Sequence, residues 1–555
     1  MDKIWLKSYP PGVPAEIDPS ELRSVKQLLE QTCAAHAGRV AFVQMGAQLT
    51  YRELDELSRA FAAYLQREGM KKGDRIAIML PNTLQYPIAL FGALRAGLVV
   101  VNTNPLYTAT ELEYQLADSG ATALVVLENF AHVAQQVLPR TKVRRAFVTS
   151  AGEYLKFPKS LIVNFVVRRV RKQVPAWSIP DAINFRQAVE EGRTLQVAEV
   201  DVGPEDLAFL QYTGGTTGVA KGAMLSHANI CTNVLQSAAW IGHAFDEPGV
   251  LITAIPLYHI FALTGNCMMF ARLGWTNVLI INPRDLPAMI GEMKRHPANY
   301  ISGVNTLFNA LLHAPGFDQV DFSGLKVTLG GGMAVQATVA ERWKQATGCI
   351  LTQAWGLTET SPAACINPDN IDFNGAIGLP ISSTEVSIKD DAGNDIPLGQ
   401  IGEICVRGPQ VMKGYWNRPD ETAKVMLEGG WLRTGDVGRM DEKGFVFIED
   451  RKKDMILVSG FNVYPNEVES AVVTHPGILE AAAVAQPDEH SGEVVALFVV
   501  RKDPTLTEKD VIGHARKSLA GYKVPKRVYF RSELPKTNVG KILRKALREE
   551  LLSSN

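Results

Sequence analysis

A short segment rich in glycine and threonine, followed by one lysine, is the first place where this sequence could do chemistry. Residues 212–227 read YTGGTTGVAKGAMLSH. Glycine exposes backbone amide donors and admits positive φ, threonine hydroxyls donate or reach a metal ion, and lysine supplies positive charge. A strict P-loop needs Ser or Thr after the lysine, and here Gly222 follows Lys221. The segment therefore predicts a phosphate-binding loop outside the P-loop class, with a glycine-rich surface turn as the alternative. Its candidate residues are Thr213, Gly214, Gly215, Thr216, Thr217, Gly218 and Lys221.

Four later segments each place a charged side chain beside glycine, threonine or an aromatic ring. They read AWGLTETSP (354–362), WLRTGDVG (431–438), EDRKKDMILVSGFNVYPNEVE (449–469) and LPKTNVGKILRKALR (534–548). The residues that could act are Trp355, Gly356, Thr358, Glu359, Asp436, Arg451, Gly460 and Lys541. Taken singly, each has an ordinary interpretation, such as a helix cap at Glu359, a turn residue at Asp436 or a solvated lysine at the C-terminus. Their joint order and spacing favour one shared site.

Strand-like and helix-like segments alternate along the first two thirds of the chain. The apolar run 75–80 precedes a helical segment, and the runs 121–127 and 278–281 are set in the same way. This alternation predicts α/β architecture with doubly wound parallel sheets. The phosphate loop follows the apolar run 207–212 and precedes the helical segment 226–240, so we expect it to link a strand to a helix.

The pattern of the sequence changes after about residue 370, where short strand-like segments are separated by Gly, Pro and Asp. We expect a large domain over residues 1–449, of which about 373–449 form a barrel-like subdomain. The charged run DRKKD (450–454) is the candidate hinge, and residues 455–555 have the α+β pattern of a small domain.

Composition excludes some classes of function. The formal net charge of −1 gives no case for nucleic acid, so an anion site has to be local. The six cysteines are scattered, without zinc-ligand spacing, which indicates reduced thiols in a cytoplasmic protein. The N-terminus has no apolar signal sequence. Residues 251–271 are apolar enough to mimic a transmembrane span, but their Pro, His, Gly and Asn favour a buried strand, turn and helix.

Together these motifs resemble the adenylate-forming superfamily, and most closely the bacterial long-chain fatty acyl-CoA synthetases. The resemblance covers about residues 25–550. It implies that the loop 213–221 holds the β- and γ-phosphates of ATP, that Thr213 and Glu359 bind or orient Mg²⁺, and that Trp355 stacks on adenine. It also implies an opposite adenine wall at Gly331 and Gly332, and ribose contacts from Asp436 and Arg451.

The resemblance assigns the remaining residues to the acid and to the second step. Lys541 would reach the carboxylate and the α-phosphate, His259 would lie beside the reacting carboxylate, and Gly460 would pass near the pantetheine arm of CoA. Taken alone, His259 is better explained as a core histidine than as an acyl-pocket residue. The small domain is expected to rotate between the two steps about a pivot at Lys453.

The implied reaction joins a medium- or long-chain fatty acid to CoA, with ATP and CoA as co-substrates and Mg²⁺ as cofactor. Two alternatives stay open: an enzyme that passes the acyl group to a carrier protein, and a non-catalytic acyl-binding or uptake partner. Some long-chain members have a tryptophan gate after the histidine, but Ile260, Phe261, Ala262 and Leu263 follow His259 here. The sequence therefore leaves open which length of fatty acid the enzyme prefers. It also leaves open whether the protein forms a homodimer.

Residues 154–180 read YLKFPKSLIVNFVVRRVRKQVPAWSIP, with six basic residues and no acidic one. Such a basic amphipathic segment can lie on anionic lipid. The alternative is a surface helix with a solvated basic face. We expect a cytoplasmic protein, with peripheral contact with the inner membrane through this segment as the hypothesis to test.

Overall fold

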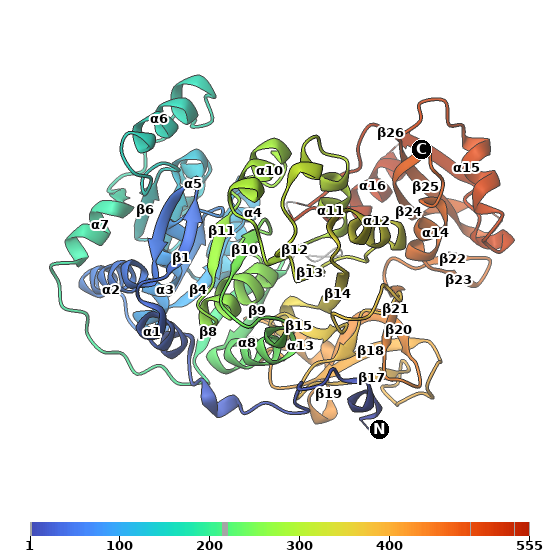
Figure 1. Ribbon diagram of the computed structural model, residues 1–555, viewed down its shortest axis with the longest axis horizontal. Helices are drawn as coiled ribbons and strands as arrows, with labels where there is room; N and C mark the ends of the chain where they lie inside the picture. Colours follow the sequence, from blue (N-terminus) through green and yellow to red (C-terminus); the bar gives the residue numbers. More distant parts are fainter. Residues whose placement is uncertain (1–2, 214–219, 489, 538, 554–555) are drawn as a thin grey trace.

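The computed structural model describes residues 3–213, 220–488, 490–537 and 539–553. Figure 1 shows a large body of sheets and helices in blue to yellow, with a smaller C-terminal unit in red beside it. Two large sheets form most of the body, a third lies below them in the view, and a fourth belongs to the C-terminal unit. The predicted α/β fold class is confirmed.

The first large sheet has seven strands in the order β7-β6-β5-β3-β4-β8-β9, and only its last pair, β8 with β9, is antiparallel. Its strands are β3 (Arg75–Met79), β4 (Val99–Asn102), β5 (Ala123–Leu127), β6 (Arg145–Thr149), β7 (Ile183–Asn184), β8 (Leu207–Thr213) and β9 (Lys221–Ser226).

The second large sheet has nine strands in the order β16-β15-β14-β13-β12-β10-β11-β1-β2 and is parallel from β1 to β14. Its strands are β1 (Val40–Gln44), β2 (Ala47–Thr50), β10 (Val250–Thr253), β11 (Thr276–Leu279), β12 (Tyr300–Gly303), β13 (Val327–Gly330), β14 (Leu351–Gly356), β15 (Ala363–Ile366) and β16 (Leu379–Pro380).

Helices connect and cover the parallel strands, as βαβ crossovers require. In the large body they are α1 (Val25–His36), α2 (Tyr51–Arg67), α3 (Gln85–Arg95), α4 (Ala109–Ser119), α5 (Ala131–Val137), α6 (Lys159–Phe165), α7 (Phe185–Gly192), α8 (His227–Ile241), α9 (Met269–Arg272), α10 (Leu286–Arg295), α11 (Asn305–Leu312), α12 (Ala337–Thr347) and α13 (Pro419–Val425). Helix α3 is mostly apolar and is buried along its whole length, Gln85 and Arg95 included, so it belongs to the core. A π-helical segment, η7 (Phe261–Met268), precedes α9.

The region predicted as barrel-like contains a five-stranded antiparallel sheet in the order β17-β18-β20-β19, with β21 paired to β20. The strands are β17 (Glu385–Lys389), β18 (Gly402–Arg407), β19 (Met426–Leu427), β20 (Trp431–Met440) and β21 (Val446–Arg451).

The C-terminal unit has its own sheet and its own apolar core. The strands are β22 (Ile456–Val458), β23 (Phe461–Val463), β24 (Ile478–Asp488), β25 (Gly492–Arg501) and β26 (Arg527–Arg531), and the helices are α14 (Pro465–Val472), α15 (Glu508–Ala515) and α16 (Arg544–Ser553). The turn 452–454 joins β21 of the large body to this unit, inside the predicted hinge. The bounds of the predicted domains stay a prediction.

The segment 251–271 is a buried strand, a turn and a helix, as expected. No helix in the part of the chain that the structure describes is both long and apolar enough to cross a bilayer. The six cysteines are all free and buried.

One prediction about local structure is wrong. The phosphate loop does not run from a strand into a helix, because the strand β9 intervenes and pairs antiparallel with β8, placing Thr213 opposite Lys221. Helix α8 begins only after Ser226, whose side chain accepts from the Asn229 amide as a helix cap. β8 and β9 are therefore an antiparallel pair, and Gly214, Gly215, Thr216, Thr217 and Gly218 between them lie outside the described residues.

Candidate active site

A cavity of about 920 Å³ lies where the two large sheets, the antiparallel sheet and the C-terminal unit meet. Most of the predicted site residues line it, although they come from distant parts of the sequence. These residues are Thr213, Lys221, His259, Gly331, Gly332, Trp355, Gly356, Thr358, Glu359, Arg451, Lys453 and Lys541.

Lys541 enters this cavity from the C-terminal unit. Its Cε and Nζ lie 3.2 and 3.7 Å from the position that a Cβ on Gly332 would take, so the lysine passes close to the end of β13. The loop that carries it is held at both ends, because Thr537 N–H donates to Lys541 C=O at 2.7 Å and Thr306 of α11 donates to Gly540 C=O at 2.9 Å. Burial, reinforced by the charge of Arg451, lowers the pKa of Lys541 to about 8.

His259 lies in the turn before η7, is half-buried and lines the same cavity. Burial and the nearby Lys541 lower its pKa to about 3, so the imidazole is neutral at physiological pH. The Phe261 amide donates to His259 Nδ1 at 3.3 Å, which leaves the proton on Nε2. A neutral imidazole with a free Nε2–H can donate to a carboxylate without taking its proton.

Trp355 and Arg451 line the cavity on either side of Asp436, which is buried between them. Trp355, at the end of β14, donates its indole N–H to Asp436 Oδ2 at 2.9 Å. Arg451 pairs with the other oxygen, Asp436 Oδ1, at 3.1 Å. Asp436 is 1% exposed, and Oδ1 accepts no hydrogen bond among the described residues. A buried carboxylate oxygen with spare acceptor capacity is suited to receiving a hydroxyl group of a ligand.

Two residues that the sequence analysis missed, Tyr415 and Glu421, line the cavity beside Lys221 and Glu359. Tyr415 donates to Glu359 Oε1 at 2.7 Å, and Lys221 Nζ pairs with Glu421 Oε2 at 2.5 Å. The lysine also lies 5.1 Å from the centre of the Tyr415 ring. Hydrogen bonds from Lys221 and Lys424 lower the pKa of Glu421 to about 2, so it is ionised. The only sequence signal was the run KGYWNRPDET (413–422), in which aromatic, basic and acidic residues are adjacent.

The donor set suits a magnesium ion that is shared with a phosphate ligand. Mg²⁺ usually takes one or two protein oxygens and completes its shell with water and substrate phosphates. Thr213 and the carboxylate of Glu359 both line the cavity, and no group of three or more His, Cys, Asp or Glu side chains in the described residues could hold a metal by itself.

Gly460 is the one described site residue that the structure leaves elsewhere. It forms the turn of the β22–β23 hairpin with Ser459, and both have positive φ, 84° and 50°. Gly460 is exposed and does not line the cavity. The structure therefore brings Lys541, but not Gly460, to the cavity.

The cavity residues described so far line a polar arm of the cavity. A second part, the apolar arm, is lined by apolar side chains. Side chains from α8, η7, α9 and three strands line it: Ile241, Phe261, Met269, Tyr300, Leu329 and Ile366. The two arms meet near Gly331, where a Cβ would lie 3.1 Å from the Phe261 ring. One cavity therefore joins a polar arm with phosphate-binding chemistry to an apolar arm.

Two parallel sheets around such a cavity, with a small C-terminal unit that inserts a lysine, define an enzyme of the adenylate-forming class. Comparison with known proteins agrees. Residues 29–416 match the family described as AMP-binding enzyme, and residues 467–541 match the AMP-binding enzyme C-terminal domain. The chain therefore belongs to the AMP-binding enzyme family.

Its relatives are similar over nearly their full length. The long-chain-fatty-acid–CoA ligase of Escherichia coli O6:H1 is 55% identical over 554 residues, which cover 99% of this chain and 98% of the relative. The ligase of that name from Haemophilus influenzae is 51% identical, with 99% of both chains covered. Among solved structures, ATP-bound MatB from Rhodopseudomonas palustris has a TM-score of 0.82 at 28% identity, covering 95% of this chain and 99% of that one. The predicted family and class of enzyme are confirmed.

Proposed function

We propose that this enzyme joins a medium- or long-chain fatty acid to CoA through an acyl-adenylate, using ATP and releasing AMP and pyrophosphate. The observation that carries the proposal is the single cavity in which Lys541 and His259 lie between the apolar arm and the Trp355–Asp436–Arg451 group. The similar ligases named above support the choice of a fatty acid.

In the first step, a carboxylate oxygen of the acid attacks the α-phosphorus of ATP, and the bond to the β-phosphate oxygen breaks. Negative charge grows on the phosphate oxygens, so fixed cations lower the barrier. We assign Lys541 to the carboxylate and the α-phosphate, and Lys221 to the departing pyrophosphate, for which it has to leave Glu421. Neutral His259 would orient the carboxylate through Nε2–H. Mg²⁺ held at Glu359 and Thr213 would neutralise phosphate charge.

In the second step, the sulfur of CoA attacks the acyl carbon, the carbon–oxygen bond to AMP breaks, and the thiol proton passes to solvent. A free thiol has a pKa near 8.5, so a small thiolate fraction exists without a dedicated base. We assign the Gly460 turn to contact with the pantetheine arm of CoA. For this contact the C-terminal unit has to take a different position relative to the large body.

The test measures pyrophosphate release across saturated acids from hexanoate to octadecanoate, with and without CoA. The proposal predicts release in the absence of CoA, limited to enzyme-bound adenylate, and multiple turnovers with AMP and thioester formation when CoA is added. Turnover only with a carrier protein that bears a free thiol, and not with CoA, would favour the carrier alternative. Absence of pyrophosphate release with every acid would indicate an acyl-binding protein and reject the proposal.

We also propose that residues 156–172 attach the enzyme to an anionic lipid surface. In this segment, α6 continues into the π-helical turn η5 (Val166–Val170) and, in Figure 1, projects away from the body on the side opposite the C-terminal unit. The segment carries large apolar side chains that face solvent: Phe157, Leu161, Ile162, Phe165 and Val170. Their exposed fractions range from 57% to 81%, which is unusual for one short segment of a globular protein.

The basic residues of this segment do not all have the same role. Arg168 pairs with the buried Glu128 at 2.8 Å and therefore holds the segment on the protein. Arg169, Arg171 and Lys172 are exposed and make no ion pair with the described residues, so their charge is available to anionic lipid.

Replacing Arg169, Arg171 and Lys172 by glutamine should weaken binding to vesicles containing anionic phospholipid by about 1 kcal/mol per charge. Turnover of a water-soluble short acid should not change. The matched control replaces Lys509, Arg516 and Lys517 on the C-terminal unit, which changes the net charge equally. Equal loss in both triple variants, or no loss in the first, would reject attachment through this segment.

A further inference from the structure

We propose that Gln211 is a positioning residue for His259: through buried hydrogen bonds it fixes the turn that presents the imidazole to the carboxylate of the acid. The inference rests on the proposed function, because it takes His259 as the group that orients this carboxylate. Gln211 belongs to β8, two residues before Thr213, and lines the cavity.

The turn that carries His259 needs partners from elsewhere in the protein. Residues 254–259, between β10 and the helical segment that contains η7, form neither helix nor strand. Within the turn, the His259 amide donates to the Pro256 carbonyl at 2.9 Å. Buried backbone groups that regular structure does not pair require side chains or water as partners. The direction in which His259 points therefore depends on the side chains that supply these bonds.

Two side chains from the start of α3 and the turn before it hold the first part of this turn. Asn82 donates to the Thr253 and Ile255 carbonyls, each at 3.1 Å. Its side-chain oxygen accepts from the Leu257 amide at 2.7 Å. The hydroxyl of Tyr86 donates to the Leu257 carbonyl at 2.9 Å. The backbone up to Leu257 is thus bound to the first large sheet and its helix.

Gln211 holds the peptide that leads directly into the histidine. Its Nε2 donates to the Tyr258 carbonyl at 2.8 Å. That carbonyl and the His259 amide belong to one planar peptide unit. Gln211 therefore fixes one side of this plane, and the bond from the His259 amide to Pro256 fixes the other. Without Gln211 the plane could turn about the remaining bond and carry the imidazole with it.

A chain of buried side chains orients Gln211 itself. Its Oε1 accepts from Asn102 Nδ2 at 3.0 Å, and Asn102 Oδ1 accepts from the Tyr86 hydroxyl at 2.7 Å. Asn102 and Gln211 are direct neighbours in the pairing of β4 with β8 and are 4% and 5% exposed. The chain therefore runs from α3 through β4 and β8 to the turn.

The direction of each bond in this chain is determined by chemistry. The Tyr258 carbonyl can only accept, so Gln211 presents Nε2 to it and Oε1 to Asn102. Oε1 can only accept as well, so Asn102 presents Nδ2 and leaves its Oδ1 to the Tyr86 hydroxyl. Exchanging nitrogen and oxygen in either amide would place two acceptors face to face. A buried network with one satisfied orientation specifies a single conformation.

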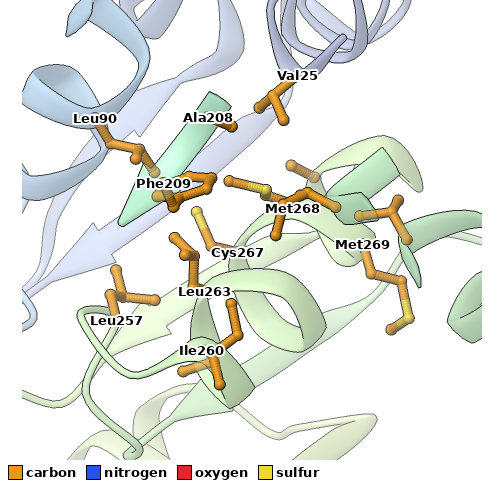
Figure 2. Close-up of a cluster of buried hydrophobic side chains, with 14 of the residues drawn as sticks. Val25, Leu90, Ala208, Phe209, Leu257, Ile260, Leu263, Cys267, Met268 and Met269 are labelled. Atoms are coloured by element: carbon orange, nitrogen blue, oxygen red, sulfur yellow. The ribbon is translucent and has the colours of Figure 1, made fainter. Parts of the chain in front are cut away.

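Apolar packing anchors the turn but leaves this peptide to the hydrogen bonds. Figure 2 shows Leu257 and Ile260, which flank Tyr258 and His259 in the sequence, in one cluster with Phe209 of β8. Leu257 and Ile260 are buried, whereas the two residues between them are half-buried. Phe209 precedes Gln211 by two residues, so both side chains lie on the same face of the sheet. One strand thus supplies an apolar contact to the cluster and a polar contact to the turn.

The experiment measures kcat and the KM values for dodecanoate and for ATP, with saturating CoA. Gln211→Met keeps the length of the side chain and removes its donor and its acceptor. We expect kcat/KM for the acid to fall by at least about tenfold, because small displacements of a positioning group are costly, while KM for ATP changes by less than about twofold. Tyr86→Phe, which removes only the far end of the chain, should lower the same ratio by a smaller factor.

Gln85→Met is the matched control. Gln85 is a fully buried glutamine beside Tyr86 in the sequence, and it donates to the Thr149 hydroxyl at 3.0 Å and the Ser150 carbonyl at 2.8 Å. Those two partners do not line the cavity. The control should therefore keep kcat/KM for the acid within about twofold of the wild type, because it loses bonds of the same kind at a distant turn.

The decisive measurement repeats Gln211→Met in a His259→Ala background. If Gln211 acts through His259, the second substitution should change kcat/KM for the acid by less than about twofold there. The same loss in both backgrounds would show a structural effect that does not involve His259 and would overturn the inference. If Gln211→Met does not fold, Tyr86→Phe takes its place in the cycle and equal losses overturn the inference in the same way.

The outcomes separate this inference from the function on which it rests. A wild-type enzyme that forms no thioester with any acid would reject the proposed function. An active wild-type enzyme in which His259→Ala leaves kcat/KM for the acid unchanged would keep the proposed function and overturn the inference. A loss in Gln211→Met that disappears in the His259→Ala background, with Gln85→Met unaffected, would support it.

Discussion

At the scale of single residues, the most consequential feature is an ammonium group that is buried where charge is needed. Lys541 lies in the cavity beside Arg451, and burial lowers its pKa to about 8. The lysine is protonated below this pH and loses its charge above it. Because the charged form stabilises the phosphate, the rate of adenylation in the free enzyme should fall as pH rises through about 8.

We therefore expect the alkaline limb of kcat/KM for ATP to begin near pH 8 in the adenylation half-reaction, because kcat/KM reports groups of the free enzyme. In Lys541→Arg this limb should vanish, even if the rate is lower, because guanidinium stays protonated throughout. Retention of the same limb in that variant would assign it to another group.

The Trp355 side chain has an aromatic ring that can stack on a ligand and an indole N–H that donates a hydrogen bond. A substitution can separate the contributions of these two groups to ATP binding. The indole N–H is a donor to Asp436 Oδ2, which leaves Oδ1 for a ligand. Trp355→Phe keeps a ring for stacking but leaves the buried carboxylate without this donor. We expect KM for ATP to rise about tenfold with kcat little changed, since hydrogen bonds to charged groups contribute about 1.5–3 kcal/mol.

The control is Trp343→Phe, which removes an indole bond of 3.2 Å to Thr328 in a different part of the core. A similar rise in KM there would point to a general loss of packing. In an Asp436→Ala background, Trp355→Phe should have little further effect, because the two residues then share no interaction to lose.

At the scale of elements, the C-terminal helix α16 secures the strand and turn that lead into the hinge. Arg544 donates to Glu469 at 2.8 and 3.0 Å and lies 3.9 Å from Asp450 and 3.8 Å from Asp454. Burial raises the pKa of Asp450 to about 6, although the charge of Arg544 opposes this shift. Leu547 and Leu551 of the same helix fill the apolar cluster against β24.

Replacing the buried cation should therefore cost stability. We expect Arg544→Met to lower the free energy of unfolding by about 3–5 kcal/mol, because Glu469 and Asp450 lose their cationic partner inside the protein, while Asp454 keeps Arg548 at 3.0 Å. Urea denaturation measures it. The neighbouring Lys545 is half exposed and pairs only with Glu549 at 3.7 Å, so Lys545→Met should change stability by less than about 1 kcal/mol. Equal losses in the two variants would mean that α16 is stabilised by its apolar face alone.

At the scale of the whole molecule, the described arrangement suits one of the two proposed steps. Lys541 is in the cavity, whereas the Gly460 turn is exposed and has no atom within 4 Å of its Cβ position. Both residues belong to the C-terminal unit, so a rigid rotation of that unit would exchange them. The turn 452–454, which contains Lys453, is the short connection about which we propose that it rotates.

Two variants should then separate the half-reactions in opposite directions. Lys541→Ala should lose adenylation and still convert synthetic acyl-adenylate to thioester. Gly460→Asn should keep adenylation, because asparagine tolerates the positive φ and the site is open here, but should impair thioester formation when the turn enters the cavity. Both half-reactions are measured on both variants. Proportional losses of the two steps in each variant would reject alternation of the unit.

The sequence alone determined the succession of elements and the chemical character of the site. Strand runs such as β3, β5 and β11 and the α+β pattern after residue 455 could be predicted, because their hydrophobic periodicity is a local property of the chain. The types and order of Trp355, Glu359, Asp436, Arg451 and Lys541 resemble those of the adenylate-forming superfamily, and that resemblance implied phosphate and nucleotide chemistry.

Only the tertiary structure decided which partners those side chains have. The segment 221–226 is a strand because β8 pairs with it, and the pairs Lys221–Glu421, Trp355–Asp436 and Arg168–Glu128 join residues that are 40 or more positions apart. Contacts between distant segments depend on the packing of whole elements, and no local pattern in the sequence encodes that packing.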